Sequence, residues 1–303
     1  MKTELKYQGA VVPMVTPVTA AGAFDEAAAE RLVDFLVAGS VAGVFVLGTT
    51  GEGAAVPRAA RQRLVELTVA RVNHRALVYA GINEPHPENI STGNAFLRAG
   101  ADVIVARPPV SHPVDQLLPW YRALLDGLEG PLIIYNIPTT TNVSIPLDVI
   151  ESLLGHPRLA GMKDSENNPG RHQELLRRFG GRPDFSIFVG VGALMENGLK
   201  LGAVGIVPSV GNLIPEVCQG LCASAQRGDW AASAKQFSRM NTVAALYQKG
   251  RTLNESLAAL KAAVSCRGLC APHMLPPLQP ISEAELASVR DQMSQLQLLN
   301  GKS

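Results

Sequence analysis

The sequence predicts an α/β protein: a (β/α)8 TIM barrel with a C-terminal helical extension. Three observations lead to this prediction. The chain has 303 residues, which corresponds to about two average domains or to one barrel of this type. Eight short runs rich in Val, Ile and Leu recur along the first two thirds of the chain. A segment with helical periodicity follows each run, as a strand–helix repeat requires.

The apolar runs are continuous, whereas a strand with one solvated face would alternate apolar and polar residues. Continuous runs are typical of parallel strands that are buried on both faces. Gly, Pro, Asn or Thr residues follow the runs and mark the strand ends. We therefore expect strands at residues 10–15, 43–47, 77–82, 102–106, 131–135, 158–162, 185–189 and 203–207.

The segments between the runs carry start signals for helices. Asp25, Pro57, Pro87 and Pro146 stand where a helix would begin. An open doubly wound sheet uses the same alternation, but it usually shows a glycine signature for a dinucleotide. We expect helices near residues 25–39, 57–73, 87–99, 114–127, 146–155, 170–180, 193–201 and 214–226.

Beyond Asp229 the pattern is helical only. Helices are expected at 229–249, 253–265 and 283–298, and several prolines interrupt the chain between the last two. We therefore predict a barrel catalytic domain at residues 1–226 and a helical appendage packed on the barrel at residues 227–303.

The composition excludes several classes of partner. Hydrophobic residues make up 47% of the chain, and 27 basic residues balance 26 acidic ones to give a net charge of +1. This balance lacks the basic footprint of a protein that binds nucleic acid or an anionic membrane. No apolar run approaches the roughly 20 residues that span a bilayer, and the opening residues lack a signal-peptide layout. We expect a cytoplasmic protein with no nucleic-acid or membrane partner.

The four cysteines form two pairs with i, i+4 spacing. Cys218 and Cys222 are one pair, and Cys266 and Cys270 are the other. Zinc sites favour two intervening residues, whereas each of these pairs encloses three residues. Free cysteines behave as small buried hydrophobes, so we predict buried thiols and neither a metal nor a cofactor.

In a barrel of this type, the chemistry resides at the C-terminal ends of the strands and in the loops that follow. The second run is followed by Gly-Thr-Thr-Gly-Glu-Gly at residues 48–53. Its closely spaced backbone N–H groups and the hydroxyls of Thr49 and Thr50 suit a small anion such as a carboxylate. The segment lacks the Lys-Ser/Thr of a phosphate-binding P-loop.

Lys163 is the only lysine placed directly at the end of an apolar run. The surrounding barrel wall would desolvate it and favour the neutral amine, which attacks a ketone to form a Schiff base. The alternative is a structural lysine paired with Asp164 or Glu166. The position of Lys163 alone favours neither interpretation.

Tyr135 ends the neighbouring run, so its phenol is expected near Lys163 in the barrel mouth. A hydroxyl there can transfer protons during imine formation and carbon–carbon cleavage. A core tyrosine bonded to a backbone group is the alternative.

Three motifs in this order and spacing resemble the dihydrodipicolinate synthase / N-acetylneuraminate lyase family. They are GTTGEG at 48–53, YNIP at 135–138 and GMKDS at 161–165. The resemblance covers nearly the whole chain. It implies a Schiff-base class I aldolase or synthase that binds pyruvate or another 2-oxo acid covalently, with an aldehyde as the other substrate. It also implies a homotetramer.

The resemblance also assigns roles to residues. Lys163 would form the imine, Tyr135 would transfer protons, and Thr49 and Thr50 would hold the carboxylate of the 2-oxo acid. The backbone groups implied to line the pyruvate pocket are those of Gly190 and Val207.

Departures from the family pattern bear on the substrate. Synthases carry an arginine two residues after the proline of the YN-x-P motif, where this chain has Thr140. A hydroxyl cannot replace the bidentate guanidinium that grips a carboxylate. Pro109 and Val110 stand in place of a tyrosine pair, and Val191 and Gly192 stand where sialic acid lyases have acidic residues.

The sequence thus favours aldol cleavage or condensation of a 2-keto-3-deoxy sugar acid, whose hydroxyls would meet the threonine-rich loop that includes Thr140. The first alternative is 4-hydroxy-tetrahydrodipicolinate (dihydrodipicolinate) synthase, which condenses pyruvate with aspartate semialdehyde. An imine-forming dehydratase or deaminase is another. A non-catalytic 2-oxo acid binding protein is the alternative outside the enzymes.

Overall fold

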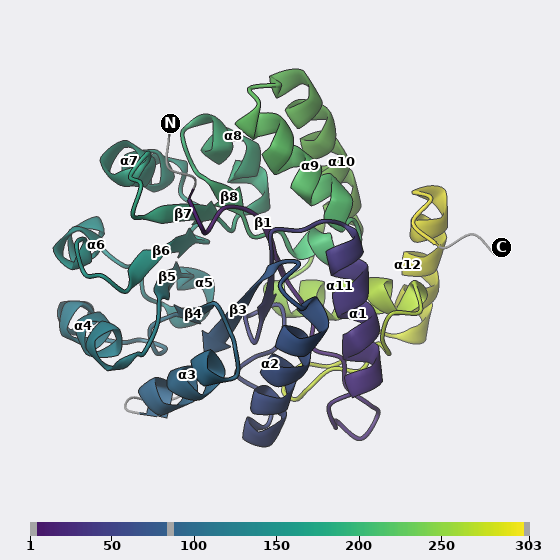
Figure 1. Ribbon diagram of the computed structural model, residues 1–303. Coiled ribbons are helices and arrows are strands. Elements are labelled where there is room, and N and C mark those ends of the chain that lie inside the picture. Colours follow the sequence, from purple (N-terminus) through teal and green to yellow (C-terminus); the bar gives the residue numbers. More distant parts are fainter. Residues whose placement is uncertain (1–4, 84–87, 300–303) are drawn as a thin grey trace.

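A closed barrel of eight parallel strands forms the centre of the molecule (Figure 1). The computed structural model describes residues 5–83 and 88–299. The strands follow one another around the barrel in chain order, and β1 closes it by pairing with β8. The strands are β1 (Gly9–Pro13), β2 (Gly43–Val46), β3 (Leu77–Ile82), β4 (Val103–Ala106), β5 (Leu132–Asn136), β6 (Leu159–Asp164), β7 (Ser186–Val189) and β8 (Gly205–Ile206).

An outer layer of helices surrounds the strands (Figure 1). The helices up to residue 226 are α1 (Glu26–Ala38), α2 (Arg58–Val72), α3 (Glu88–Arg98), α4 (Leu117–Gly127), α5 (Pro138–Thr141), α6 (Leu147–Leu153), α7 (Pro169–Phe179), α8 (Met195–Lys200) and α9 (Pro215–Gln226). Short 3-10 turns occur at η1 (Val114–Gln116), η2 (Gly192–Leu194) and η3 (Ser209–Asn212). Pro87, one of the expected helix starts, lies outside the described residues.

The predicted fold class is confirmed, and the differences are local. Strand β6 runs two residues beyond the expected 158–162, because Lys163 and Asp164 continue the pairing with β5 and β7. The short helix α5 was not predicted. Pro138 occupies its first turn, where the missing N–H of proline costs no hydrogen bond.

The barrel has two apolar cores because successive strand residues face opposite sides. Val105 and Ile133 belong to the interior cluster, together with Tyr135 and Phe188. Their chain neighbours Ile104 and Ile134 belong to the larger cluster between the strands and the outer helices. The interior is therefore filled with side chains, and the mouth of the barrel is where a site for small molecules is expected.

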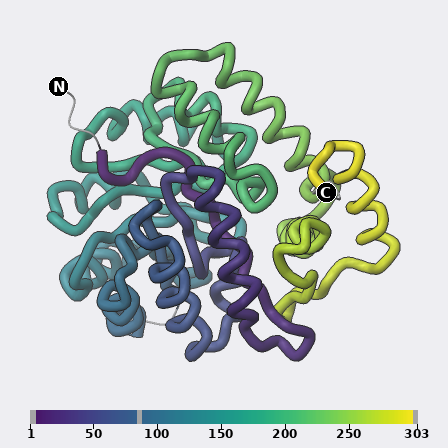
Figure 2. Tube along the Cα trace, turned by 45° about the vertical axis from the view of Figure 1, so that its right-hand side comes forward, coloured from purple at the N-terminus to yellow at the C-terminus, as the bar shows by residue number. Residues whose placement is uncertain are grey.

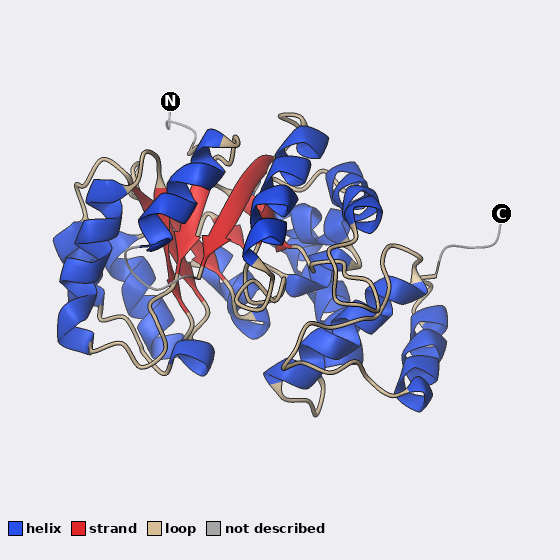
Figure 3. Cartoon of the chain, turned by 90° about the horizontal axis from the view of Figure 1, so that it is seen from below, coloured by secondary structure: helices blue, strands red, loops and turns tan. Residues whose placement is uncertain are grey.

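Three further helices follow the barrel: α10 (Trp230–Gln248), α11 (Leu253–Cys266) and α12 (Glu283–Gln295). Capping boxes at Thr252 and Ser282 start the last two. Figure 2 shows α11 and α12 together on one side of the molecule, with α12 at its edge, and Figure 3 shows helices on the side where the chain ends. The division of the chain near residue 226 stays a prediction. No helix in residues 5–83 or 88–299 is long and apolar enough to cross a membrane.

Two of the four cysteines lie in α9, one ends α11, and one lies in the segment after α11. Cys218, Cys222 and Cys270 are buried, and Cys266 is half-buried. Burial raises the pKa of the Cys222 thiol to about 12, so this group is protonated at neutral pH. Within the described residues, no group of three His, Cys, Asp or Glu side chains is arranged to hold a metal ion.

Candidate active site

A cavity of about 190 Å³ lies at the C-terminal ends of the barrel strands. Thr49 and Thr50 reach it from the loop after β2, and Tyr135 and Lys163 reach it from β5 and β6. Residues that the chain separates by more than a hundred positions therefore share one small cavity. Gly190 and Val207 also line the cavity, together with Pro13, Ile137, Thr139, Ser165, Ser209, Tyr247, Gln248, Leu253, Ser256 and Leu257.

Lys163 is enclosed by aromatic side chains. It is 6% exposed, and its Nζ lies 3.9 Å from the ring centroid of Tyr135 and 5.0 Å from that of Phe45. Asp164 and Glu166 do not pair with it, since both carboxylates face Arg171. The geometry therefore contradicts the interpretation of Lys163 as a lysine paired with either carboxylate.

Tyr135 stands opposite Lys163 in the register of β5 and β6. Its hydroxyl lies 3.4 Å from Thr49 Oγ1 and also interacts with Lys163 and Ser165. Burial by itself would raise the pKa of Tyr135, but the charge of Lys163 and these hydrogen bonds outweigh burial and lower it. The four other tyrosines of the chain all have raised pKa values because of burial. Tyr135 is thus the one tyrosine of the chain whose pKa is lowered, as groups at functional sites often have shifted pKa values.

The loop that carries Thr49 and Thr50 is held in a strained conformation. Leu47 and Glu52 have φ angles of 61° and 53°, in the left-handed region that non-glycine residues rarely adopt. A Cβ atom on Gly53 would lie 1.9 Å from the Leu47 carbonyl oxygen, so only glycine fits there. Such strain persists only where the surroundings fix the conformation, and it is concentrated at functional sites.

The remaining predicted site residues differ in their placement. The Gly190 N–H donates to the Asp164 carbonyl at 2.7 Å, and a Cβ on Gly190 would lie 2.0 Å from Ser165 Oγ. Glycine at this position therefore leaves room for Ser165 to reach the cavity. Thr140 does not line the cavity: it lies in α5 with its hydroxyl directed at the Ile137 carbonyl, and Thr139 lines the cavity instead.

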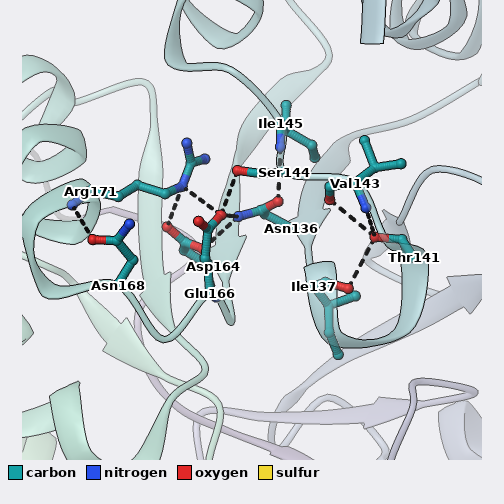
Figure 4. Close-up of polar contacts among 10 residues, drawn as sticks. All are labelled: Asn136, Ile137, Thr141, Val143, Ser144, Ile145, Asp164, Glu166, Asn168 and Arg171. Carbon is teal, nitrogen blue, oxygen red and sulfur yellow. Dashed lines mark hydrogen bonds and ion pairs between the residues drawn. The ribbon is translucent and has the colours of Figure 1, made fainter. Parts of the chain in front are cut away.

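A polar network lies behind the strand ends that carry Tyr135 and Lys163 (Figure 4). Asn136 and Asp164 are the next residues along β5 and β6, and the Asn136 side chain donates to Asp164 Oδ1 at 2.9 Å. Arg171 of α7 lies 3.5 Å from Asp164 Oδ2 and 3.2 Å from Glu166 Oε2. Asn136 also accepts from the Ile145 N–H at 3.1 Å. The network fixes the two strand ends relative to each other, and with them the residues that face the cavity.

Sequence reasoning missed the contribution of the C-terminal helices. The Tyr247 hydroxyl of α10 lies 2.8 Å from Ser209 Oγ, and Gln248 donates to it at 3.3 Å. Leu253, Ser256 and Leu257 of α11 close the other side of the cavity. A second cavity of about 320 Å³ adjoins the first and shares Gly190, Ser209, Tyr247 and Gln248 with it. No motif marks these helices, because single polar residues on a helix look like an ordinary surface.

Comparison with known proteins gives matches along nearly the whole chain. The model of the dihydrodipicolinate synthetase family matches residues 6–296. The 4-hydroxy-tetrahydrodipicolinate synthase of Phenylobacterium zucineum (strain HLK1) is 31% identical over 286 residues, which cover 93% of this chain and 95% of that one.

Two solved structures have the same fold. Dihydrodipicolinate synthase from Bacteroides thetaiotaomicron has a TM-score of 0.90 at 28% identity, with 97% of this chain and 100% of that one covered. YagE, a prophage protein of the dihydrodipicolinic acid synthase family from E. coli K12 in complex with pyruvate, has a TM-score of 0.89 at 25% identity. That match covers 96% of this chain and 99% of YagE.

The fold and the cavity define a class, the barrel enzymes that place a buried lysine amine at the C-terminal ends of the strands. Within that class, the chain belongs to the dihydrodipicolinate synthetase family. Members of this family are Schiff-base-forming carbon–carbon lyases, and this protein is an enzyme of that kind. The family resemblance that the sequence motifs indicated is confirmed.

Proposed function

We propose that the protein is a pyruvate-dependent class I aldolase in which Lys163 forms the Schiff base. The observation that carries this proposal is the position of Lys163 against Tyr135, the one tyrosine whose pKa is lowered, in a cavity that Thr49 and Thr50 also line. The Thr49–Thr50 segment binds the carboxylate of the 2-oxo acid, with the backbone groups of Gly190 and Val207 along the pocket wall.

The chemistry follows from these positions. The Lys163 amine adds to the ketone carbon of the 2-oxo acid, and Tyr135 delivers a proton to the oxygen, which leaves as water. The phenolate of Tyr135 that this step leaves accepts a proton from C3 of the imine, which gives an enamine. The enamine attacks an aldehyde and forms the new carbon–carbon bond, and Tyr135 returns the proton to the aldehyde oxygen. In the reverse direction, Tyr135 accepts the proton of the C4 hydroxyl as that bond breaks. Water then hydrolyses the imine and restores Lys163.

The substrate that we propose is a 2-keto-3-deoxy sugar acid. Thr139, Ser165 and Ser209 offer hydroxyls to the cavity, and Gln248 offers an amide. These groups match the hydroxyls of a sugar chain, and the adjoining cavity offers space for its far end. The absence of an arginine at position 140 agrees with a substrate that lacks a carboxylate at that point.

One observation favours a second candidate, 4-hydroxy-tetrahydrodipicolinate synthase. Arg107 directly follows β4, two residues beyond the interior residue Val105 and one beyond Ala106, which pairs with Ile134. The strand register therefore directs Arg107 toward the mouth of the barrel beside Tyr135. Among the described residues its guanidinium has no hydrogen-bond or ion-pair partner. It supplies a cation for the carboxylate of an aldehyde such as aspartate semialdehyde.

The test combines adduct mapping with turnover. The protein is incubated with pyruvate and reduced with borohydride, and the modified peptide is identified by mass spectrometry. We expect a pyruvyl adduct on Lys163 and none in Lys163→Ala. Turnover is then measured with 2-keto-3-deoxy sugar acids and with pyruvate plus aspartate semialdehyde, and the substrate that is turned over distinguishes the two candidate functions. A folded protein with no adduct at saturating pyruvate would falsify the Schiff-base role of Lys163.

An adduct without turnover of any aldehyde would favour the non-catalytic binding protein. The homotetramer implied by the family resemblance is part of the proposal, and sedimentation velocity tests it. The cytoplasmic location predicted from the sequence stays a prediction.

A further inference from the structure

A buried ion pair joins the loop after β2 to the C-terminal helix α11. Glu52 of the loop and Lys261 of α11 are in direct contact through Oε1 and Nζ, and each side chain is 1% exposed. Each charge has one more partner: Leu275 N–H donates to Glu52 Oε2 at 2.7 Å, and Lys261 Nζ donates to the His273 carbonyl at 2.9 Å. A buried pair whose hydrogen bonds are satisfied in this way has one favourable arrangement, because moving either side chain would leave a buried charge without its partner.

The loop end of this pair lies within the segment that carries the cavity threonines. The Glu52 N–H donates to the Thr49 carbonyl at 3.1 Å, and the next N–H, of Gly53, donates to the Gly48 carbonyl at 3.0 Å. Glu52 itself has a φ angle of 53°. This conformation costs free energy and needs external contacts to hold it. The contact with Lys261 is such a restraint, and it acts three residues from Thr49.

Lys261, the other member of the pair, belongs to helix α11, which lines the same cavity. Leu257 reaches the cavity from α11, and Lys261 follows four residues later on the same face of the helix. One face of α11 therefore closes the cavity and holds the loop through which Thr49 and Thr50 enter it.

We propose that Glu52 and Lys261 are positioning residues, through which the C-terminal helical extension fixes the carboxylate-binding loop. This inference rests on the proposed function, because it takes Thr49 and Thr50 to hold the carboxylate of the 2-oxo acid. The pair touches neither substrate nor Lys163. It acts on the affinity for the 2-oxo acid and leaves the chemistry of the imine unchanged.

The test uses the full chain and three variants of the pair: Glu52→Gln, Lys261→Met and the double variant. Borohydride trapping at a series of pyruvate concentrations gives a half-saturating concentration and a maximal rate for each protein. We expect the half-saturating concentration to rise about tenfold in the single variants, with the maximal rate changed less than about threefold, as for a loss of ground-state binding. If a single variant fails to fold, the double variant replaces it, because it leaves no charge unpaired.

Met293→Ala serves as the matched control. Met293 is a buried residue of α12, so its truncation loosens the extension without touching the loop. We expect it to lower the melting temperature and leave the half-saturating pyruvate concentration unchanged. An equal rise in this control, or no rise in the folded pair variants, would overturn the proposal.

A second measurement separates this proposal from the function itself. Amide hydrogen exchange of the peptide covering residues 47–56 reports on the loop without any substrate. We expect faster exchange in the pair variants and wild-type exchange in Met293→Ala. Absence of a wild-type pyruvate adduct would refute the proposed function alone. Unchanged exchange in the folded pair variants would refute the positioning role, whatever the adduct shows.

Discussion

At the scale of single residues, Tyr135 shows how the mouth of the barrel shifts the pKa of a side chain. Burial raises the pKa of the four other tyrosines, whereas Lys163, Thr49 and Ser165 lower that of Tyr135. A lowered pKa means that the phenol ionises at a lower pH than the others. In a spectrophotometric titration of the folded protein, we therefore expect the first tyrosinate absorbance to come from Tyr135.

Two variants check the assignment. Tyr135→Phe should remove the first step of the titration and lower kcat by about 10²- to 10⁴-fold, the range that general acid–base groups contribute. Thr49→Val should shift the step to higher pH, because a hydrogen bond to the phenol is lost. A first step that persists in Tyr135→Phe would show that another tyrosine ionises first.

Arg107 is the residue that bears on the second candidate function, the condensation of pyruvate with aspartate semialdehyde. We expect Arg107→Gln to lower kcat/KM for aspartate semialdehyde by about tenfold or more, since a charge-assisted contact contributes about 1.5–3 kcal/mol. Turnover with an uncharged aldehyde of similar length should change little, and so should the half-saturating pyruvate concentration. Equal losses for both aldehydes would exclude carboxylate recognition by Arg107.

At the scale of secondary-structure elements, the adjacent strands β5 and β6 set the geometry of the site. Tyr135 and Lys163 face inward at one register position, and Asn136 and Asp164 face the polar network at the next. Arg171 is the cation of that network. Arg171→Leu leaves the fully buried Asp164 carboxylate without its cation, so we expect a loss of about 3–5 kcal/mol in unfolding free energy.

Urea unfolding measures this change. The matched control is Arg177→Leu on the same helix, because Arg177 pairs with Glu174 at the exposed surface. Exposed pairs contribute little, so the control should unfold near the wild-type midpoint. Similar midpoints for both variants would contradict the importance of the buried network.

The elements were predictable to the extent that burial leaves a pattern in the sequence. Each of the eight apolar runs overlaps one strand, because parallel strands buried on both faces need continuous apolar residues. The end of β6 was less predictable, because Lys163 and Asp164 are polar and look like the start of a loop. Their placement in the strand depends on pairing with β5 and β7 and on Arg171, which are tertiary contacts.

The candidate site was also predictable in part, because the barrel fold fixes where functional groups lie. The rule that functional groups follow barrel strands led to Thr49, Thr50, Tyr135 and Lys163, which share one cavity. The same rule does not predict Tyr247 or Ser256, because these residues reach the cavity from helices beyond the barrel. Their roles in catalysis, like those of the predicted residues, stay predictions for the experiments above.

At the scale of the whole molecule, the barrel and the C-terminal helices form one continuous structure. Helix α10 packs against α9 of the barrel, and residues of both regions belong to one apolar cluster. The ion pair of Glu52 with Lys261 crosses between the regions with both charges buried. We therefore expect calorimetry of the full chain to show one cooperative transition, in which the extension does not melt ahead of the barrel.

The same pair gives a sharper prediction of whole-molecule stability. Lys261→Met leaves the buried Glu52 carboxylate without its cation, and we expect a loss of about 3–5 kcal/mol in unfolding free energy. Adding Glu52→Gln removes that uncompensated charge, so the double variant should be more stable than Lys261→Met alone. Denaturant unfolding of the four proteins completes a double-mutant cycle. A double variant whose loss equals the sum of the single losses would mean that the two charges do not interact, although they are in contact. A coupling energy of a kcal/mol or more would show that the extension and the loop form one energetic unit.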